Sequence, residues 1–184
     1  MTTPRTIKAP TRFTQCVAGL AIAIAAAATP GLAEEGFHPA RTAPEIALNR
    51  ILRRADADHV LLDNLFKRYG PVPRARRVDY SAFLTPELLA ALASTEAKMV
   101  KENCGGQYRD GEICGLDYSP ITCAQDYAKP YSYRTESSGP GRASIAYKWP
   151  HRHDIAARYD LKIDAGVWKI DNISCGADGN FHAR

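Results

Sequence analysis

The sequence predicts an α+β domain in which N-terminal helices pack on a strongly curved antiparallel sheet that two disulfides stabilise. Apolar residues recur at helical spacing from about residue 42 to residue 104, and strict alternation replaces that spacing after residue 131. Helical segments that precede all the strands, instead of alternating with them, are typical of α+β domains. Four cysteines that follow an export signal favour disulfides.

The first 33 residues have the composition of an export signal. An uncharged apolar run follows three cations, Arg5, Lys8 and Arg12, and small residues precede Glu34. Because the apolar run is short for a membrane span, we expect cleavage after Ala33 and no membrane span in the mature protein. The mature protein is then periplasmic or secreted, with a short flexible lead at 34–44 and a single α+β domain at 45–184.

Loss of this signal removes most of the net charge. The chain has 24 Lys and Arg against 20 Asp and Glu, and three of the cations but none of the acids precede Glu34, which leaves 21 cations. A near-neutral domain lacks the positive field of a nucleic-acid binder, so we expect no nucleic-acid partner. One tight basic cluster follows Pro73, and it is interpreted as a solvated loop or as a patch for an anionic partner: Arg74, Arg76 and Arg77.

The mature chain retains four cysteines, because Cys16 lies inside the signal: Cys104, Cys114, Cys123 and Cys175. An even number in an exported chain favours two disulfides, and no spacing among the four suits a tetrahedral zinc site. Three connectivities are possible. We favour the pairing that closes the short glycine-rich loop, Cys104 with Cys114, and that ties the following segment to the last strand, Cys123 with Cys175.

The first helical segment begins near Thr42, which has capping-box spacing to Glu45. Its apolar stripe runs from Leu48 to Tyr69, and the following Gly-Pro pair ends it. Asp favours helix starts, so the Asp56–Asp58 segment leaves open whether the stretch is one helix or two.

A second helical segment begins at Thr85-Pro86-Glu87, where Thr suits the cap, Pro the first turn and Glu the positive end of the helix dipole. It ends at Cys104-Gly105-Gly106. After a Cys- and Gly-rich crossing, alternation predicts three or four antiparallel strands that open at Tyr131 and turn at Gly139–Gly141 and at Asp164–Gly166.

The closing hairpin from Leu161 to Ile173 resembles the last two strands of nuclear-transport-factor-2-like cone domains. Together with Phe83–Leu89, and with Asp117–Ile121 leading to Gln125-Asp126, it resembles a family of small exported bacterial proteins classed as a domain of unknown function, from about Leu62 onward. The resemblance implies a bent sheet whose concave side forms a pocket for ligands or for catalysis. It carries over no catalytic residues, and the Asp-His pair of some cone-fold isomerases and dehydratases has no counterpart here.

Candidate pocket residues lie on the crossing segment and on the strands. Two carboxylates near a phenol suit a polar pocket, or general acid-base chemistry if burial raises one pKa, whereas the same residues also cap turns. Strand aromatics line pockets for glycans or apolar ligands, and they also fill cores. The candidate ligand-pocket residues are Asp117, Tyr118, Gln125, Asp126, Tyr133, Tyr147 and Trp168.

Histidines supply the remaining candidate chemistry. His151 and His153, beside Asp154, form the most metal-like group, but a loop does not guarantee that its ligands converge, so we interpret the group as a polar loop. His59 is interpreted as a helix residue at the border of the core. We therefore expect neither a metal site nor a cofactor.

These features predict an exported, non-catalytic binding module that holds a small molecule, a cell-wall fragment or a protein segment in a concave pocket. Two alternatives stay open. One is a hydrolase or isomerase that uses Asp117 or Asp126. The other is an inhibitor or immunity-type protein that binds an exported toxin and exposes an apolar patch for that purpose.

Overall fold

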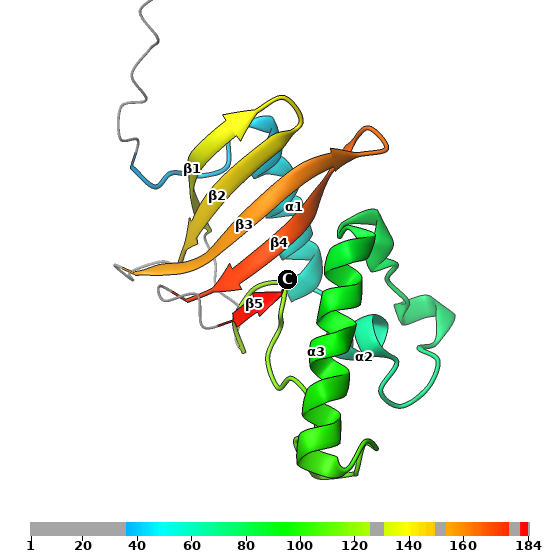
Figure 1. Cartoon of the computed structure of the whole chain (residues 1–184). Helices are drawn as coiled ribbons and strands as arrows, with labels where there is room; N and C mark the ends of the chain where they lie inside the picture. The colour runs from blue at the N-terminus through cyan, green and yellow to red at the C-terminus, as the bar shows by residue number, and fades with distance from the viewer. Residues whose placement is uncertain (1–35, 126–130, 150–153, 177–180, 184) are drawn as a thin grey trace, which may run out of the picture. The chain divides into compact units, whose positions relative to one another are not determined.

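The computed structural model describes residues 36–125, 131–149, 154–176 and 181–183. Its helices all precede its strands, which confirms the α+β class (Figure 1). The helices are α1 (Ala43–Asp56), α2 (Leu61–Phe66) and α3 (Pro86–Cys104), with short 3₁₀ helices at Arg74–Arg76 and Tyr80–Ala82. The strands are β1 (Ser132–Gly139), β2 (Arg142–Lys148), β3 (Ile155–Asp164), β4 (Val167–Cys175) and β5 (Phe181–Ala183).

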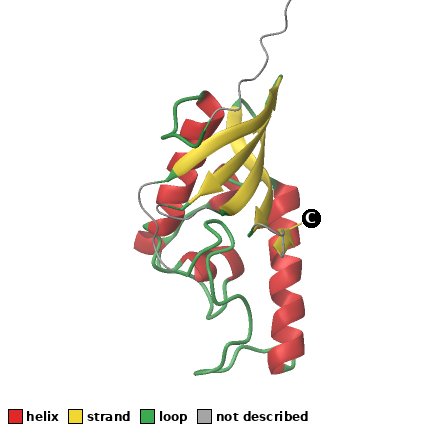
Figure 2. Cartoon of the chain, turned by 90° about the vertical axis from the view of Figure 1, so that its left-hand side faces the viewer, coloured by secondary structure: helices red, strands yellow, loops and turns green. Residues whose placement is uncertain are grey.

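The strands form one sheet in the order β1-β2-β3-β4-β5, and every neighbouring pair is antiparallel. Four long strands follow one another as hairpins, as the alternation predicts, and the sheet is visibly curved (Figure 2). The short β5 was not expected. The structure confirms the predicted antiparallel α+β arrangement, and the finer assignment to a cone fold stays a prediction.

The helices take two different positions on this sheet. α1 crosses one face, whereas α3 lies beside the edge formed by β4 and β5, where we expected it to share the face with α1 (Figures 1 and 2). The backbone pins the start of α3 to β4, because Thr85 donates to the carbonyl of Ile170 at 3.0 Å and Ile170 donates to that of Phe83 at 2.9 Å.

The core lies between α1 and the sheet. The helical stripe of α1 presents fully buried aliphatic side chains, and the alternating residues of β2, β3 and β4 meet them from the sheet. The shared cluster includes Leu48, Ile51, Leu52, Ile145, Tyr147, Tyr159, Leu161, Ile170 and Ile173. Ile163, which the alternation places in the same row, is instead 45 % exposed near the end of β3.

The helix boundaries follow their capping residues. At α1, the side chain of Glu45 accepts the backbone N–H of Thr42 at 3.1 Å, which completes the predicted capping box. α3 begins with Thr85 as its N-cap and ends at Gly105, whose φ of 68° suits glycine. The Asp56–Asp58 segment separates two helices, α1 and α2, which confirms the two-helix alternative for that stretch.

The segment before α1 is attached to the sheet. His38 donates to the carbonyl of Tyr133 at 3.0 Å and accepts from its N–H at 2.8 Å. The described part of the 34–44 lead therefore adds a short antiparallel bridge beside β1.

Both disulfides have the favoured pairing. Cys104 is bonded to Cys114, which closes the loop after α3, and Cys123 is bonded to Cys175, which ties the crossing segment to the end of β4. The second bond links positions 52 residues apart. It therefore fixes the crossing segment, whose described residues contain no helix or named strand, against the sheet.

Candidate functional site

A cavity of about 360 Å³ lies where the turn between α1 and α2 meets the crossing segment. Its walls come from three stretches that are distant in sequence, namely 55–63, 68–69 and 117–125. The polar lining residues are Asp56, Asp58, His59, Asp63, Arg68, Tyr69, Asp117, Tyr118, Ser119, Thr122 and Gln125. Three of the seven residues predicted from the sequence, Asp117, Tyr118 and Gln125, are among them.

Asp58 is held in place by three donors. One of its carboxylate oxygens accepts the backbone N–H of Val60 at 3.1 Å, and the other accepts from Asn64 Nδ2 and from the Tyr80 hydroxyl, each at 2.9 Å. Burial, and then the bond to Asp58, raises the pKa of Tyr80 far above its usual value, so the phenol remains a donor. Asp58 is therefore a preorganised anion on the cavity wall.

The opposite wall is a tight turn of the crossing segment. Ser119 donates its N–H to the carbonyl of Ala124 at 3.0 Å, and its Oγ accepts the N–H of Thr122 at 3.1 Å. Gln125 Nε2 donates to Asp117 Oδ2 at 3.2 Å across the same turn. These bonds fix the positions of the two predicted residues, and the adjacent Cys123 disulfide ties the turn to β4.

Tyr118 is a half-buried phenol on the crossing-segment wall of the cavity. Burial, and then the neighbouring charge of Asp117, raises its pKa above the usual value for a tyrosine. At ordinary pH it is consequently a neutral hydroxyl that donates a hydrogen bond, and it is not a base.

A buried ion pair supports the segment that leads into this wall. Arg68 Nη2 lies 2.7 Å from Glu96 Oε1, and the same nitrogen donates to the carbonyl of Leu116 at 2.6 Å. Glu96 Oε2 accepts the N–H of Leu116 at 2.8 Å, and its Oε1 accepts from the Tyr108 hydroxyl at 2.9 Å. The residue immediately before Asp117 is therefore clamped on both its N–H and its carbonyl.

The cavity is acidic. Four aspartates line it against one guanidinium, that of Arg68, whose charge is already engaged by Glu96. Carboxylates in a partly desolvated cavity attract cations more strongly than they do in bulk water. The arrangement therefore favours a ligand that carries positive charge together with hydrogen-bonding groups.

The other predicted site residues lie elsewhere. Tyr133 and Tyr147 are 1 % and 0 % exposed and belong to the core beneath α1, which makes them packing residues and not lining residues of the described cavities. Trp168 lies on β4, partly buried against the same core. Asp126, His151 and His153 lie outside the described residues, and Asp154 is exposed in a bend.

Sequence reasoning missed the half of the cavity that α1 and α2 supply. Asp56 and Asp58 were noted for their capping tendency and His59 as a border residue, but nothing local indicates that they face Asp117. The available signal was the clustering of two acids and a histidine at a helix junction, where loops often carry function.

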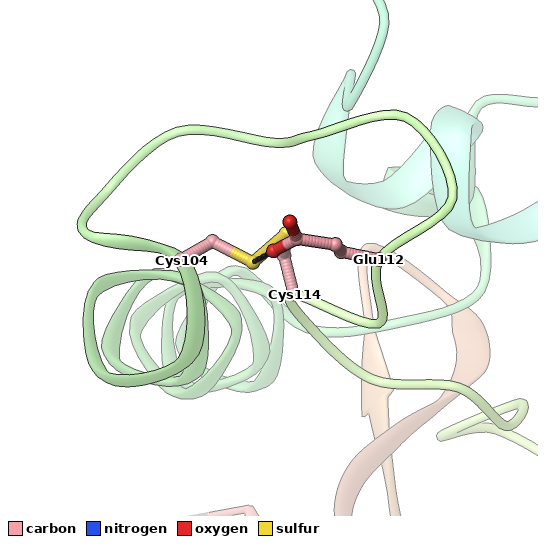
Figure 3. A group of neighbouring side chains, drawn as sticks. All are labelled: Cys104, Glu112 and Cys114. Atoms are coloured by element: carbon pink, nitrogen blue, oxygen red, sulfur yellow. Dashed lines mark hydrogen bonds between the residues drawn. A yellow bond between two sulfur atoms is a disulfide. The ribbon is translucent and has the colours of Figure 1, made fainter.

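One group of potential metal ligands is found among the described residues: Cys104, Glu112 and Cys114 (Figure 3). Both sulfurs are in the disulfide, and the Glu112 carboxylate lies 3.5 Å from Cys104 Sγ. Because metal ions bind thiolates, the oxidised pair is not a ligand set.

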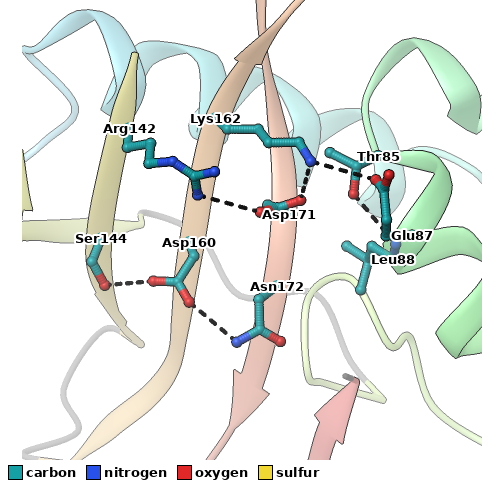
Figure 4. Close-up of polar contacts among 9 residues, drawn as sticks. All are labelled: Thr85, Glu87, Leu88, Arg142, Ser144, Asp160, Lys162, Asp171 and Asn172. Carbon is teal, nitrogen blue, oxygen red and sulfur yellow. Dashed lines mark hydrogen bonds and ion pairs between the residues drawn. The ribbon is translucent and has the colours of Figure 1, made fainter. Parts of the chain in front are cut away.

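A second polar cluster covers the face of the sheet opposite α1 (Figure 4). Asp160 accepts from Ser144 at 2.8 Å and from Asn172 at 3.1 Å, while Lys162 lies 2.8 Å from Asp171. Two shallow cavities of about 460 and 440 Å³ share Asp160, Asp171 and Asn172. The charges here are paired with one another, as on an ordinary solvated sheet face.

Comparison of the chain with protein-family models, with curated proteins and with solved structures finds no match. Among the described residues, no helix has the length and apolar character needed to cross a membrane. The resemblance to cone-fold proteins therefore remains an expectation from the residues alone.

Proposed function

We propose that this protein is an exported, non-catalytic binding module whose acidic cavity holds a small cationic ligand. The carrying observation is the convergence of Asp117, Tyr118 and Gln125 with the Asp56–His59 turn on one cavity of about 360 Å³. That volume lies within the range of small-molecule sites. Two disulfides are consistent with an oxidising compartment outside the cytoplasm.

The hydrogen bonds that already engage the polar groups of the cavity favour binding over catalysis. Asp58 accepts three hydrogen bonds, which fix the position of its side chain on the cavity wall. Tyr118 stays protonated because its pKa is raised, and Ser119 Oγ is engaged by the turn. These groups orient a ligand by charge and by hydrogen bonds. They do not supply a poised base.

The chemistry of the cavity indicates an amine as the recognised group. An ammonium group meets the aspartates, and Tyr118 and the Gln125 amide offer hydrogen bonds to neighbouring hydroxyls or amides. Amine-bearing fragments, including amino sugars and short basic peptides, fit this description within the small-molecule, cell-wall and protein-segment classes.

The test compares a cationic amino sugar with its uncharged N-acetylated derivative. Glucosamine and N-acetylglucosamine are titrated against the oxidised protein, with spermidine as a second cation, and binding is followed by NMR shifts of the crossing segment. We expect glucosamine and spermidine to bind, and Asp117→Asn to weaken both by about tenfold. Asp110→Asn, on the exposed loop after α3, is the matched control and should leave affinity unchanged.

Equal binding of N-acetylglucosamine would show that charge is not recognised and would remove the cationic-ligand assignment. Absence of binding by both cations, in protein whose disulfides are intact, would remove the cavity from consideration as an amine site.

A further inference from the structure

The basic loop, residues 67–77, joins α2 to the 3₁₀ turn at Tyr80–Ala82. It contains five cations and neither Asp nor Glu: Lys67, Arg68, Arg74, Arg76 and Arg77. Arg68 is turned inward to Glu96, while the other four cations are exposed. A domain whose charges nearly balance therefore concentrates four exposed cations in one loop.

The exposed cations of the basic loop form no ion pair with any of the residues that the structure describes. Cations of α3 and the sheet do pair: Lys98 with Glu102, Arg158 with Glu136, Lys162 with Asp171, and Lys169 with Asp164. The exposed cations of the basic loop are consequently not held in ion pairs by the described acids, and they can contact a partner.

The loop is held in shape without the charges of Lys67, Arg74 and Arg76. Asn64 Nδ2 donates to the carbonyl of Arg76 at 3.1 Å, and Asn64 Oδ1 accepts the N–H of Val78 at 3.2 Å. Arg77 Nη2 donates to the carbonyl of Val72 at 3.1 Å. The guanidinium groups of Arg74 and Arg76 take part in none of these bonds. A surface ordered beforehand loses less conformational entropy when it binds.

A cavity of about 560 Å³ adjoins the exposed turn. Lys67 and Arg77 line it together with Val72, and Asp63 and Asp79 also contribute to its walls. The Asp79 carboxylate accepts the N–H of Ser81 at 2.9 Å, so that acid is engaged by its own turn. The basic loop thus combines cations inside a hollow with cations on an exposed turn.

We propose that the basic loop binds a linear phosphate-bearing polymer other than a nucleic acid, with Arg74 and Arg76 on the exposed turn and Lys67 and Arg77 at the cavity. Guanidinium groups match phosphate oxygens in bidentate fashion, and lysine adds a point charge. Cations spread over a turn and a hollow engage successive anions of one chain better than a single small anion. This surface adjoins the acidic cavity, because Asp63 lines both cavities, but none of its four exposed cations lines the acidic cavity.

The test measures binding of long-chain inorganic polyphosphate to the oxidised protein at low ionic strength. Arg74→Gln/Arg76→Gln should weaken binding about fivefold, because each exposed charge contact contributes modestly. Lys98→Gln/Lys101→Gln on exposed positions of α3 removes the same charge and should leave affinity within about twofold of the native value. Added salt should weaken native binding. Circular dichroism and unfolding midpoints confirm that both variants fold.

Three results would overturn the assignment. The first is that polyphosphate does not bind the native protein at low salt. The second is that both double variants lose the same affinity, which would show that binding depends on net charge alone and not on the basic loop. Polyglutamate binding as tightly as polyphosphate would show a carboxylate-bearing partner instead. Asp117→Asn should retain polyphosphate binding, so a failure of the amine site and a failure of the basic loop are distinguishable.

Discussion

Arg68 and Glu96 form an ion pair of 2.7 Å inside the protein, with the side chains 13 % and 3 % exposed. Arg68 follows α2 and Glu96 lies in the middle of α3, so the pair joins the two helices, and both side chains also bond the backbone of Leu116. The next residue, Asp117, lines the acidic cavity. The pair therefore connects helix packing to the geometry of the candidate site.

Glu96→Gln should destabilise the protein by about 3 kcal/mol, because it leaves the largely buried Arg68 guanidinium without its counter-charge. Urea denaturation measures the change in the free energy of unfolding. Glu102→Gln removes an exposed charge that pairs with Lys98 at 4.0 Å, and it should change stability by less than about 0.5 kcal/mol. Equal effects of the two substitutions would show that the buried pair contributes no more than a surface pair.

Gly115→Ala tests the packing against the same carboxylate. A Cβ at position 115 would overlap the Glu96 carboxyl group, so the substitution should destabilise by about 1 to 3 kcal/mol. Gly139→Ala is the control, because a Cβ there meets nothing within 4 Å. The effect should shrink in a Glu96→Ala background. A similar loss in both backgrounds, measured by a double-mutant cycle, would place the cause elsewhere.

The sequence predicted the elements well because their signals are local. The capping residues Thr42 and Thr85, and Gly105 after the second long helix, gave the helix boundaries, and alternation gave the four long strands. β5 escaped prediction because three residues are too few for a period of two to stand out.

The sequence predicted only the part of the candidate site that the crossing segment supplies, because the other part reaches the cavity through contacts between segments that are distant in sequence. Asp117 and Gln125 were recognised on the crossing segment, but their approach to Asp58 depends on how α2 packs, and no local pattern encodes that. For Tyr133 and Tyr147, alternation predicted the correct face of the sheet. It left open whether these side chains line a pocket or fill the core, and α1 packs on this face and makes them core.

The loss of stability on removing each disulfide should increase with the length of the loop that the disulfide closes. In the chain-entropy description, opening the bond between Cys104 and Cys114, which are 10 residues apart, lowers the free energy of unfolding by about 3 kcal/mol. Opening the bond between Cys123 and Cys175, which are 52 residues apart, lowers it by about 4 kcal/mol. Paired Cys→Ser variants, unfolded in urea, test this order. Replacing both Cys123 and Cys175 by Ser should also weaken glucosamine binding, because Cys123 adjoins Ala124 and Gln125 on the cavity wall. A reversed order of stabilities would contradict the loop-length account.

Glu45 should give the protein an acid-sensitive contribution to stability. Burial opposes its charge, but hydrogen bonds from Thr42, Thr135 and Arg41 outweigh burial and lower its pKa below the usual 4.5. Its contribution is therefore present above pH 4.5 and is lost as the pH falls through the lowered folded-state value. The stability difference between native protein and Glu45→Gln should narrow over that window. A difference that is constant with pH would contradict this.

Buried tyrosines should make the protein unfold cooperatively in alkali. Burial raises the pKa of the Tyr108 phenol to about 12, and it moves those of four others above their usual 10.0: Tyr80, Tyr133, Tyr147 and Tyr159. Above pH 10 the unfolded chain releases phenolic protons that the folded protein retains, so stability falls as the pH rises.

Tyrosinate absorbance and far-ultraviolet circular dichroism, recorded together against pH, measure this transition. Most of the tyrosinate absorbance should appear together with the loss of dichroism, since the phenols in the core ionise when the core opens, whereas the exposed Tyr69 does not report on the core. Tyr133→Phe removes one such proton and should reduce the slope of unfolding free energy by about 1.4 kcal/mol per pH unit in the alkaline range. Gradual formation of all the tyrosinate near pH 10 with unchanged dichroism would show that Tyr133, Tyr147 and Tyr159 are accessible in the folded protein, against their burial in the core beneath α1.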